Sequence, residues 1–170
     1  MILSREEILK AVRRGGISIT PFDKRAVGPC SVDLRLGGVF RILKKTARPV
    51  VVGEKTSSAD YSGMVVVGKQ GLIIKPGEVV LGVTKEKISL SSGLCARIDG
   101  RTRFARLGLL VHLSSSLVQP GVNNVQVLEI MNASPNELVL KPGLKICQLV
   151  FEELKGTAVY GGAFRYQTKP

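Results

Sequence analysis

Short apolar runs separated by turn residues make up most of the chain after residue 17. The runs include Met64–Val67, Leu72–Ile74, Val79–Val83 and Val125–Ile130, and Gly, Pro, Ser and Asn separate them. Runs of this length bounded by turn residues are typical of β-strands. We therefore expect a mainly β protein.

One short helix is predicted at the N-terminus. Ser4 followed three residues later by Glu7 has the form of a capping box, in which each side chain satisfies a free backbone N–H of the first turn. Apolar residues then recur at helical spacing until Gly15–Gly16, where the pattern stops. The helix is expected to end there.

Two segments of the chain echo each other. Leu72–Gly77 and Leu138–Gly143 both place Lys-Pro-Gly after an apolar triplet, and another apolar run follows each. A Pro-Gly turn between two apolar runs predicts a hairpin. Repeated hairpins in a small domain favour a distorted β-barrel or a jelly roll, because both protect sheet edges. Lys44–Gly63, rich in Lys, Ser and Gly, is expected to be a loop or excursion.

Length and composition favour a single domain spanning residues 1–170. With 170 residues and 44% hydrophobic content, the chain can bury one sizeable core but is short for two domains. No apolar run approaches the roughly 18 residues of a membrane span. Met1–Lys10 mixes acidic and basic residues without the apolar core of a signal peptide. We expect a soluble, cytoplasmic protein with no membrane partner.

The formal net charge of +12 favours a polyanionic partner. Nucleic acid and nucleoside triphosphates both meet that description. Aromatic residues make up only 5% of the chain and Trp is absent, so the stacking residues that single-strand binders interleave with basic ones are missing. We therefore expect no nucleic-acid partner. The scattered Lys and Arg residues are also compatible with an ordinary solvated surface.

The cysteines and the histidine do not predict a zinc site. Cys30, Cys95 and Cys147 lie far apart without a C-x-x-C pair, and His112 is the only histidine. All three cysteines are expected to be small buried hydrophobes. Zinc-dependent nucleobase deaminases need H-x-E and P-C-x-x-C motifs, and neither occurs in the sequence.

The segment Asp99–Gly108 is the densest in groups that bind phosphate. It holds Arg101, Thr102, Arg103 and Arg106 beside glycines. Arginine presents a planar fork of donors that matches phosphate oxygens, and a threonine hydroxyl adds a neutral donor. An exposed basic turn is the alternative that composition alone leaves open.

Glu129 is a carboxylate within an apolar strand pattern. Because side chains alternate between the faces of a strand, Glu129 shares a face with Val127 and Met131. A carboxyl group in apolar surroundings is suited to proton transfer near neutral pH. The alternative is an edge-strand glutamate that reaches water.

The motifs of this chain resemble those of the dCTP deaminase family, within the dCTP deaminase/dUTPase superfamily, along nearly its whole length. In chain order they are Met1–Ser4 with Glu7–Leu9, Ile19–Asp23, Ser31–Gly37, Pro76–Glu78 with Leu81, Gly82 and Thr84, Gly100–Leu109, Pro120–Gly121, Leu128–Ile130 with Asn132, and Pro142–Gly143 with Gln148–Leu149. The resemblance implies a dUTPase-like distorted β-barrel or jelly roll with a short N-terminal helix. It also implies a homotrimer whose active sites are shared between subunits.

The resemblance also implies roles for individual residues. Glu129 matches the catalytic glutamate that activates a water for attack on C4 of cytosine, and Arg106 and Thr102 match catalytic positions beside the phosphates. The implied substrate-binding residues are Arg101, Arg103, Ser115, Gln119, Tyr160 and Gln167. Ser115 falls where backbone groups read the pyrimidine edge, and Tyr160 and Gln167 belong to a flexible tail, from about residue 156, that closes over the nucleotide.

The implied ligands are dCTP or dUTP, with dTTP as a candidate inhibitor. Mg²⁺ is expected to arrive bound to the substrate triphosphate, because this ion prefers phosphate and water oxygens to a cage built by protein alone. No zinc and no metal site built by the protein are expected.

Five positions depart from the family pattern. Gln119 stands where an aspartate is usual, Asn124 replaces a glycine, Thr102 and Arg103 each replace a serine, and Ala163 replaces a common lysine. In relatives that hydrolyse dUTP, that aspartate activates the attacking water, and an amide cannot accept the proton. We therefore expect deamination of dCTP to dUTP and ammonia. The alternatives are a dUTP diphosphatase or bifunctional enzyme that forms dUMP and pyrophosphate, and a nucleotide-binding homologue without turnover.

Overall fold

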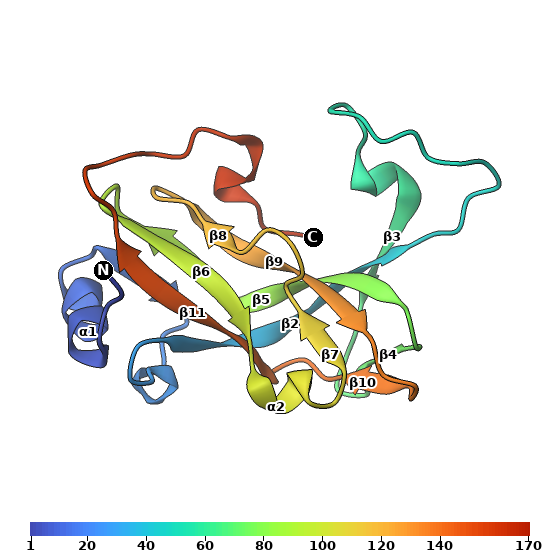
Figure 1. Ribbon diagram of the computed structural model, residues 1–170, viewed down its shortest axis with the longest axis horizontal. Helices are drawn as coiled ribbons and strands as arrows, with labels where there is room; N and C mark the ends of the chain where they lie inside the picture. The colour runs from blue at the N-terminus through green and yellow to red at the C-terminus, as the bar shows by residue number, and fades with distance from the viewer.

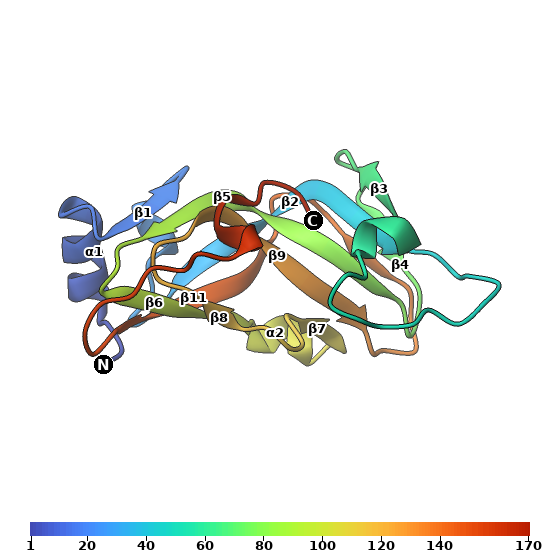
Figure 2. The same ribbon diagram turned by 90° about the horizontal axis from the view of Figure 1, so that it is seen from above.

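The computed structural model describes residues 1–170 as a mainly β protein built on one curled sheet of nine strands (Figures 1 and 2). The strands are β1 (Ile17–Thr20), β2 (Val32–Leu43), β3 (Ser62–Val66), β4 (Leu72–Ile74), β5 (Val79–Leu90), β6 (Leu94–Gly100), β7 (Leu109–Val111), β8 (Leu117–Val118), β9 (Asn123–Asn132), β10 (Leu138–Leu140) and β11 (Lys145–Glu153). The helical elements are α1 (Arg5–Arg13), α2 (Thr102–Ala105), η1 (Lys24–Ala26), η2 (Ser58–Tyr61) and η3 (Ala163–Tyr166). No helix is both long and apolar enough to cross a bilayer.

The sheet has the order β7-β9-β5-β2-β11-β6-β8, with β1 also pairing with β5 and β3 with β2. All of its pairs are antiparallel. One large apolar cluster fills the concave interior, and its bulkiest members are Phe40 and Phe151. The mainly β class predicted from the apolar runs is confirmed.

The predicted N-terminal helix is confirmed as α1. The Ser4 hydroxyl accepts a hydrogen bond from the Glu7 amide at 3.4 Å, which is one half of the expected capping box. Ile8 is fully buried against the sheet. The helix ends before Gly15, whose φ of 76° is a left-handed conformation that glycine adopts without strain.

The prediction of two separate hairpins is wrong. β4 and β10, the two echoing segments, pair with each other in a small second sheet, with Leu138 opposite Ile74 and Leu140 opposite Leu72 (Figure 1). A Pro-Gly turn shows that the chain changes direction, but it does not choose the hydrogen-bonding partner. The strands that follow these turns, β5 and β11, are paired within the large sheet instead.

A bulge in β5 determines how it pairs with β9. The register shifts between Val83 and Lys87, so that three residues of β5 oppose the single residue Gln126. The Thr84 hydroxyl accepts a hydrogen bond from the Gln126 amide at 3.0 Å and donates one to the Glu86 carbonyl at 2.7 Å. The bulge therefore leaves the Gln126 amide satisfied and fixes the residue in place.

The cysteines occupy three different environments. Cys147 is buried, Cys95 is half-buried, and Cys30 is exposed, so the expectation that all three are buried is wrong for Cys30. Cys30 follows a Gly-Pro pair in a surface turn before β2, and its burial could not be judged from its apolar character. Burial raises the pKa of the Cys147 thiol far above its usual range.

Candidate functional site

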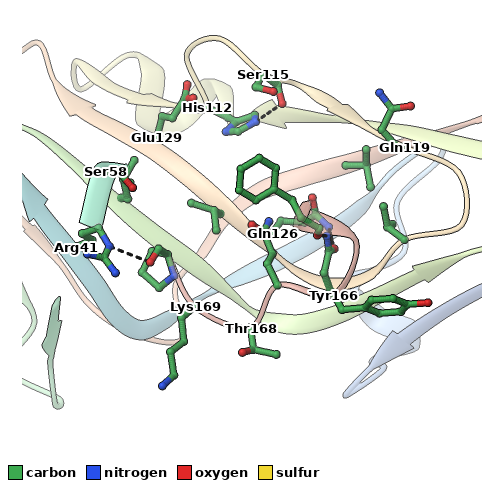
Figure 3. Close-up of a pocket in the computed structure, with 18 of the residues that line it drawn as sticks. Arg41, Ser58, His112, Ser115, Gln119, Gln126, Glu129, Tyr166, Thr168 and Lys169 are labelled. Atoms are coloured by element: carbon green, nitrogen blue, oxygen red, sulfur yellow. Dashed lines mark hydrogen bonds between the residues drawn. The ribbon is translucent and has the colours of Figure 1, made fainter. Parts of the chain in front are cut away.

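The main cavity of the protein has a volume of about 730 Å³ and lies between β5, β8, β9 and the C-terminal tail, residues 156–170. Five of the residues predicted to form the site line it: Ser115, Gln119, Glu129, Tyr160 and Gln167. Figure 3 shows Glu129, His112 and Ser115 together along one side of this cavity, apart from Arg41 and Lys169. Glu129 carries the only acidic side chain among the lining residues.

Glu129 is held by the loop that connects β7 to β8. Its carboxylate accepts a hydrogen bond from the Ser114 backbone amide at 2.8 Å, and the Ser114 hydroxyl lies 2.9 Å from both carboxylate oxygens. The His112 amide also donates to the Glu129 carbonyl at 2.8 Å. Backbone and side chain are therefore both fixed, and the carboxylate has a defined direction at the cavity wall.

The face of β9 that carries Glu129 is less buried than the sequence suggested. As alternation predicts, Glu129 shares its face with Val127 and Met131, and all three are half-buried. The opposite face is the buried one, and it carries the polar Asn124 and Gln126 as well as apolar residues. Glu129 therefore faces the cavity and its contents rather than the apolar core.

Arg41 is a cavity residue that the sequence analysis did not identify. It pairs with Leu81 on β5, and Leu81 pairs with Glu129 on β9, so the three residues form one row across three strands. Neighbouring strands lie about 4.8 Å apart, which puts the backbones of Arg41 and Glu129 about 10 Å apart. Only the pairing of β2, β5 and β9 reveals this row, and no local motif does.

His112 shapes the wall beside Glu129. Its backbone has a φ of 63°, unusual for a residue other than glycine, and its Nε2 lies 2.6 Å from the Ser115 carbonyl oxygen. Because a carbonyl only accepts, Nε2 is the protonated nitrogen in this contact. The other ring nitrogen, Nδ1, is buried without a partner. The histidine therefore fixes the direction of the Ser115 carbonyl.

The arginine segment around α2 lies outside the cavity. Thr102, Arg103 and Arg106 are exposed and make no side-chain hydrogen bond or ion pair. Arg101 differs, because its Nε lies 3.4 Å from Asp33 and it donates to the Lys145 carbonyl at 3.0 Å. One chain therefore does not bring these four predicted residues to Glu129, and their roles stay predictions.

The C-terminal tail, red in Figure 1, supplies part of the cavity wall through Tyr160, Phe164 and residues 166–170. The Tyr160 amide donates to the Pro120 carbonyl at 2.8 Å, and the Val125 amide of β9 donates to the Gln167 carbonyl at 3.2 Å. Arg165 Nε donates to the Gly121 carbonyl at 3.0 Å. Tyr160 and Gln167, predicted as tail residues of the site, are thereby placed at its wall.

Gln119 also lines the cavity, next to the turn that joins β8 to β9. Its side chain makes no hydrogen bond within the chain, so its amide is available to a ligand. A neutral amide can donate and accept hydrogen bonds but cannot act as a base. It therefore contributes polar recognition rather than proton transfer.

Comparison with known proteins identifies the family. Residues 2–154 match the sequence model of the family described as dCTP deaminase-like. A protein of Corynebacterium kroppenstedtii named dCTP deaminase, dUMP-forming, is 38% identical over 151 residues, which cover 88% of this chain and 80% of that protein. A Marinomonas protein named dCTP deaminase is 38% identical over 168 residues, which cover 93% of this chain and 86% of that protein.

A solved structure has the same fold. The crystal structure of 2'-deoxycytidine 5'-triphosphate deaminase from Agrobacterium tumefaciens superimposes with a TM-score of 0.70 at 21% sequence identity. The match covers 91% of this chain and 49% of that one, so this chain spans about half the length of the Agrobacterium chain. At this identity the likeness establishes the architecture and not the reaction.

Proposed function

Because the chain belongs to the dCTP deaminase-like family, we propose that it hydrolyses the 4-amino group of dCTP and releases dUTP and ammonia. The observation that supports this reaction best is the direction of Glu129. Its carboxylate is held by the Ser114 amide and hydroxyl at the wall of a cavity large enough for a nucleotide. A fixed carboxylate at such a wall is suited to general-base catalysis.

In the proposed mechanism, Glu129 takes a proton from a water molecule while the water oxygen attacks C4 of the cytosine ring. The new C–O bond forms as ring nitrogen N3 takes up electron density. The C–N bond to the amino group then breaks as C4 becomes a carbonyl, and the second proton of the water ends on N3. Glu129 returns the proton to the departing nitrogen, which leaves as ammonia. The carboxylate ends in its original state, as a general acid–base catalyst must.

The wall beside Glu129 supplies a means of recognising the base. We place the Ser115 carbonyl at the edge of the pyrimidine, where its second lone pair accepts from the 4-amino group. The first lone pair is engaged by His112 Nε2 at 2.6 Å. This contact holds the acceptor still, and it favours an amino-bearing base over one that presents a carbonyl at C4.

For the phosphates, we propose that Arg103, Arg106 and Thr102 act on the cavity of a neighbouring copy in a homotrimer. Two observations support this arrangement: the three side chains are exposed and unpaired, and the cavity of their own chain has only Arg41 and Lys169 as lysine or arginine side chains. Two lysine or arginine side chains are few for a triphosphate. Arg101 is paired with Asp33, and in this arrangement the ion pair positions the segment around α2.

Mg²⁺ belongs to the proposed substrate rather than to the protein. The residues present fit this arrangement, because Glu129 is the only acidic side chain in the cavity and is already bound by Ser114. Mg²⁺ keeps several water ligands and binds through phosphate oxygens in nucleotide sites. The ion would neutralise part of the triphosphate charge while the arginines orient it.

The final product, dUTP or dUMP, distinguishes the proposed function from a second candidate function. Several relatives, including those of Corynebacterium kroppenstedtii and Nocardioides, carry the name dUMP-forming, which favours a further hydrolysis of dUTP. Gln119 favours release of dUTP, because its amide cannot activate a water for attack on phosphorus. We propose dUTP as the product on that ground.

Product analysis separates the two candidates. The purified protein is incubated with dCTP or with dUTP in the presence of Mg²⁺, and ammonia, dUTP, dUMP and pyrophosphate are quantified. Ammonia and dUTP from dCTP, with dUTP itself unchanged, are expected. Release of dUMP and pyrophosphate would contradict the role given to Gln119. The Gln119→Asp variant is expected to gain dUMP formation. Adding dTTP to the dCTP assay tests whether dTTP inhibits deamination, as the sequence resemblance led us to expect.

A further inference from the structure

Two buried amide side chains on β9 connect the sheet to the C-terminal tail. Asn124 and Gln126 are only 4% and 6% exposed and lie on the more buried side of the strand, where they also line the cavity beneath the tail. A buried amide destabilises a protein unless its donors and acceptors find partners. The partners of this pair therefore show what the two residues do.

The two amides form a directed chain of hydrogen bonds that ends on the tail. Gln126 Nε2 donates to Asn124 Oδ1 at 2.6 Å, and Asn124 Nδ2 donates to the Phe164 carbonyl at 2.7 Å. The Gln126 backbone is fixed by Thr84 at the bulge of β5. The Phe164 carbonyl is the only hydrogen-bond acceptor that the structure assigns to the Asn124 side chain.

Of the three aromatic side chains of the tail, Tyr160 packs against the apolar core, but the two that follow it do not hold the tail in place. Phe164 and Tyr166 are 65% and 62% exposed, so most of their surface remains in solvent. Hydrogen bonds attach the tail to the backbone of Ser92, of the turn before β9 and of β9 itself, and Arg41 Nε on β2 donates to the Pro170 carbonyl at 2.9 Å. The bond from Asn124 differs from these because its donor is buried, and a buried donor without a partner is more costly than an exposed one.

We propose that Asn124 and Gln126 are positioning residues that hold the tail against the cavity. Undocking the tail leaves the Asn124 donor without its partner, which biases the tail toward the docked position. The tail lines the cavity with Tyr160 and Gln167. For nucleotide binding, the inference rests on the proposed function: a docked tail raises the affinity for dCTP and leaves the chemical step at Glu129 unchanged.

Hydrogen–deuterium exchange of the full-length protein, without nucleotide, tests the docking directly. In the Asn124→Ala variant, the amides of residues 158–167 are expected to exchange about tenfold faster, which corresponds to the loss of one buried hydrogen bond. Asn124→Asp, which keeps the shape but removes the donor, is expected to act in the same direction. Asn124→Gly serves if either variant folds poorly.

Asn123→Ala is the matched control. Asn123 is the neighbouring amide on the opposite face of β9, and its side chain makes no hydrogen bond with the tail. In the Asn123→Ala variant, the tail amides are expected to exchange at the wild-type rate. Wild-type exchange in both Asn124→Ala and Asn124→Asp would overturn the docking role, whatever the substrate of the protein.

Kinetics with dCTP then test the consequence for binding. Asn124→Ala is expected to raise KM about tenfold and to change kcat by less than about twofold. Because both amides act through one contact, Asn124→Ala combined with Gln126→Val is expected to match the stronger single variant rather than add to it. A loss confined to kcat would overturn the positioning role. Absence of turnover in the wild type would refute the proposed function alone, since the exchange measurement stands independently.

Discussion

The wall around Glu129 and the arginine segment around α2 both carry groups suited to nucleotide chemistry, but they differ in how far contacts within the chain hold these groups. At the wall, the carboxylate has two donors from Ser114 and a neighbouring carbonyl fixed by His112. On α2, Thr102 and Arg106 point into solvent without partners. One region is assembled within a single chain, and the other is left open.

The difference shows which groups a fold must hold in advance. A catalytic carboxylate acts through its direction, so hydrogen bonds that fix it increase its effectiveness. An arginine that is to bind phosphate has to remain without a carboxylate partner, since an internal ion pair would compete with the ligand. Arg101, which is bound to Asp33, illustrates the structural alternative within the same segment.

Removing the base from the assembled region should have the largest effect. Glu129→Gln is expected to lower the rate of ammonia release from dCTP by about 10²- to 10⁴-fold, because the amide keeps the shape but cannot accept a proton. Calorimetry should show nucleotide binding nearly unchanged. Glu137→Gln, at an exposed glutamate without an ion pair, is the control. Substantial residual turnover would show that Glu129 is not the general base.

An intermediate effect is expected from the open region. Arg106→Ala should lower kcat/KM for dCTP by about 10- to 100-fold, the range for a hydrogen bond between charged groups. Steady-state kinetics measure it, and Arg48→Ala, an exposed arginine in the loop after β2, should match the wild type. Unchanged kinetics in Arg106→Ala would show that this arginine is an ordinary surface residue, and would weaken the contrast between the two regions.

The smallest effect should come from loosening the carboxylate without removing it. Ser114→Ala eliminates the hydroxyl contacts to Glu129 but keeps the amide contact at 2.8 Å. A decrease in kcat of about five- to tenfold is expected, with KM nearly constant, because one of the two donors to the carboxylate is lost while the backbone amide still holds it. Ser116→Ala is the control in the same loop. An effect as large as that of Glu129→Gln would mean that Ser114 itself takes part in the chemistry.

The sequence predicted what depends on local chemistry. The capping residues of α1, the strand character of residues 125–130 and the face that Glu129 shares with Val127 and Met131 follow from caps, apolar runs and alternation. These signals act within a few residues of the chain. They therefore survive in any tertiary arrangement that satisfies them.

What the sequence could not predict depends on pairing between distant strands. The β4 and β10 pair replaces the two expected hairpins, and the position of Arg41 beside the cavity arises from the register of β2 with β5. The hydrogen bond that fixes the Gln126 backbone depends on the bulge in β5. Each results from packing across the sheet, which periodicity along one strand does not encode.

The contact between Glu129 and the Ser114 backbone amide bears on how freely the site can change over evolutionary time. A main-chain donor is present whichever side chain the residue carries, so drift at position 114 alters the hydroxyl contribution and leaves this hydrogen bond in place. Proline is the single exception, because its ring removes the N–H. The backbone path of the loop thus determines the direction of the carboxylate more than the identity of the loop residues does.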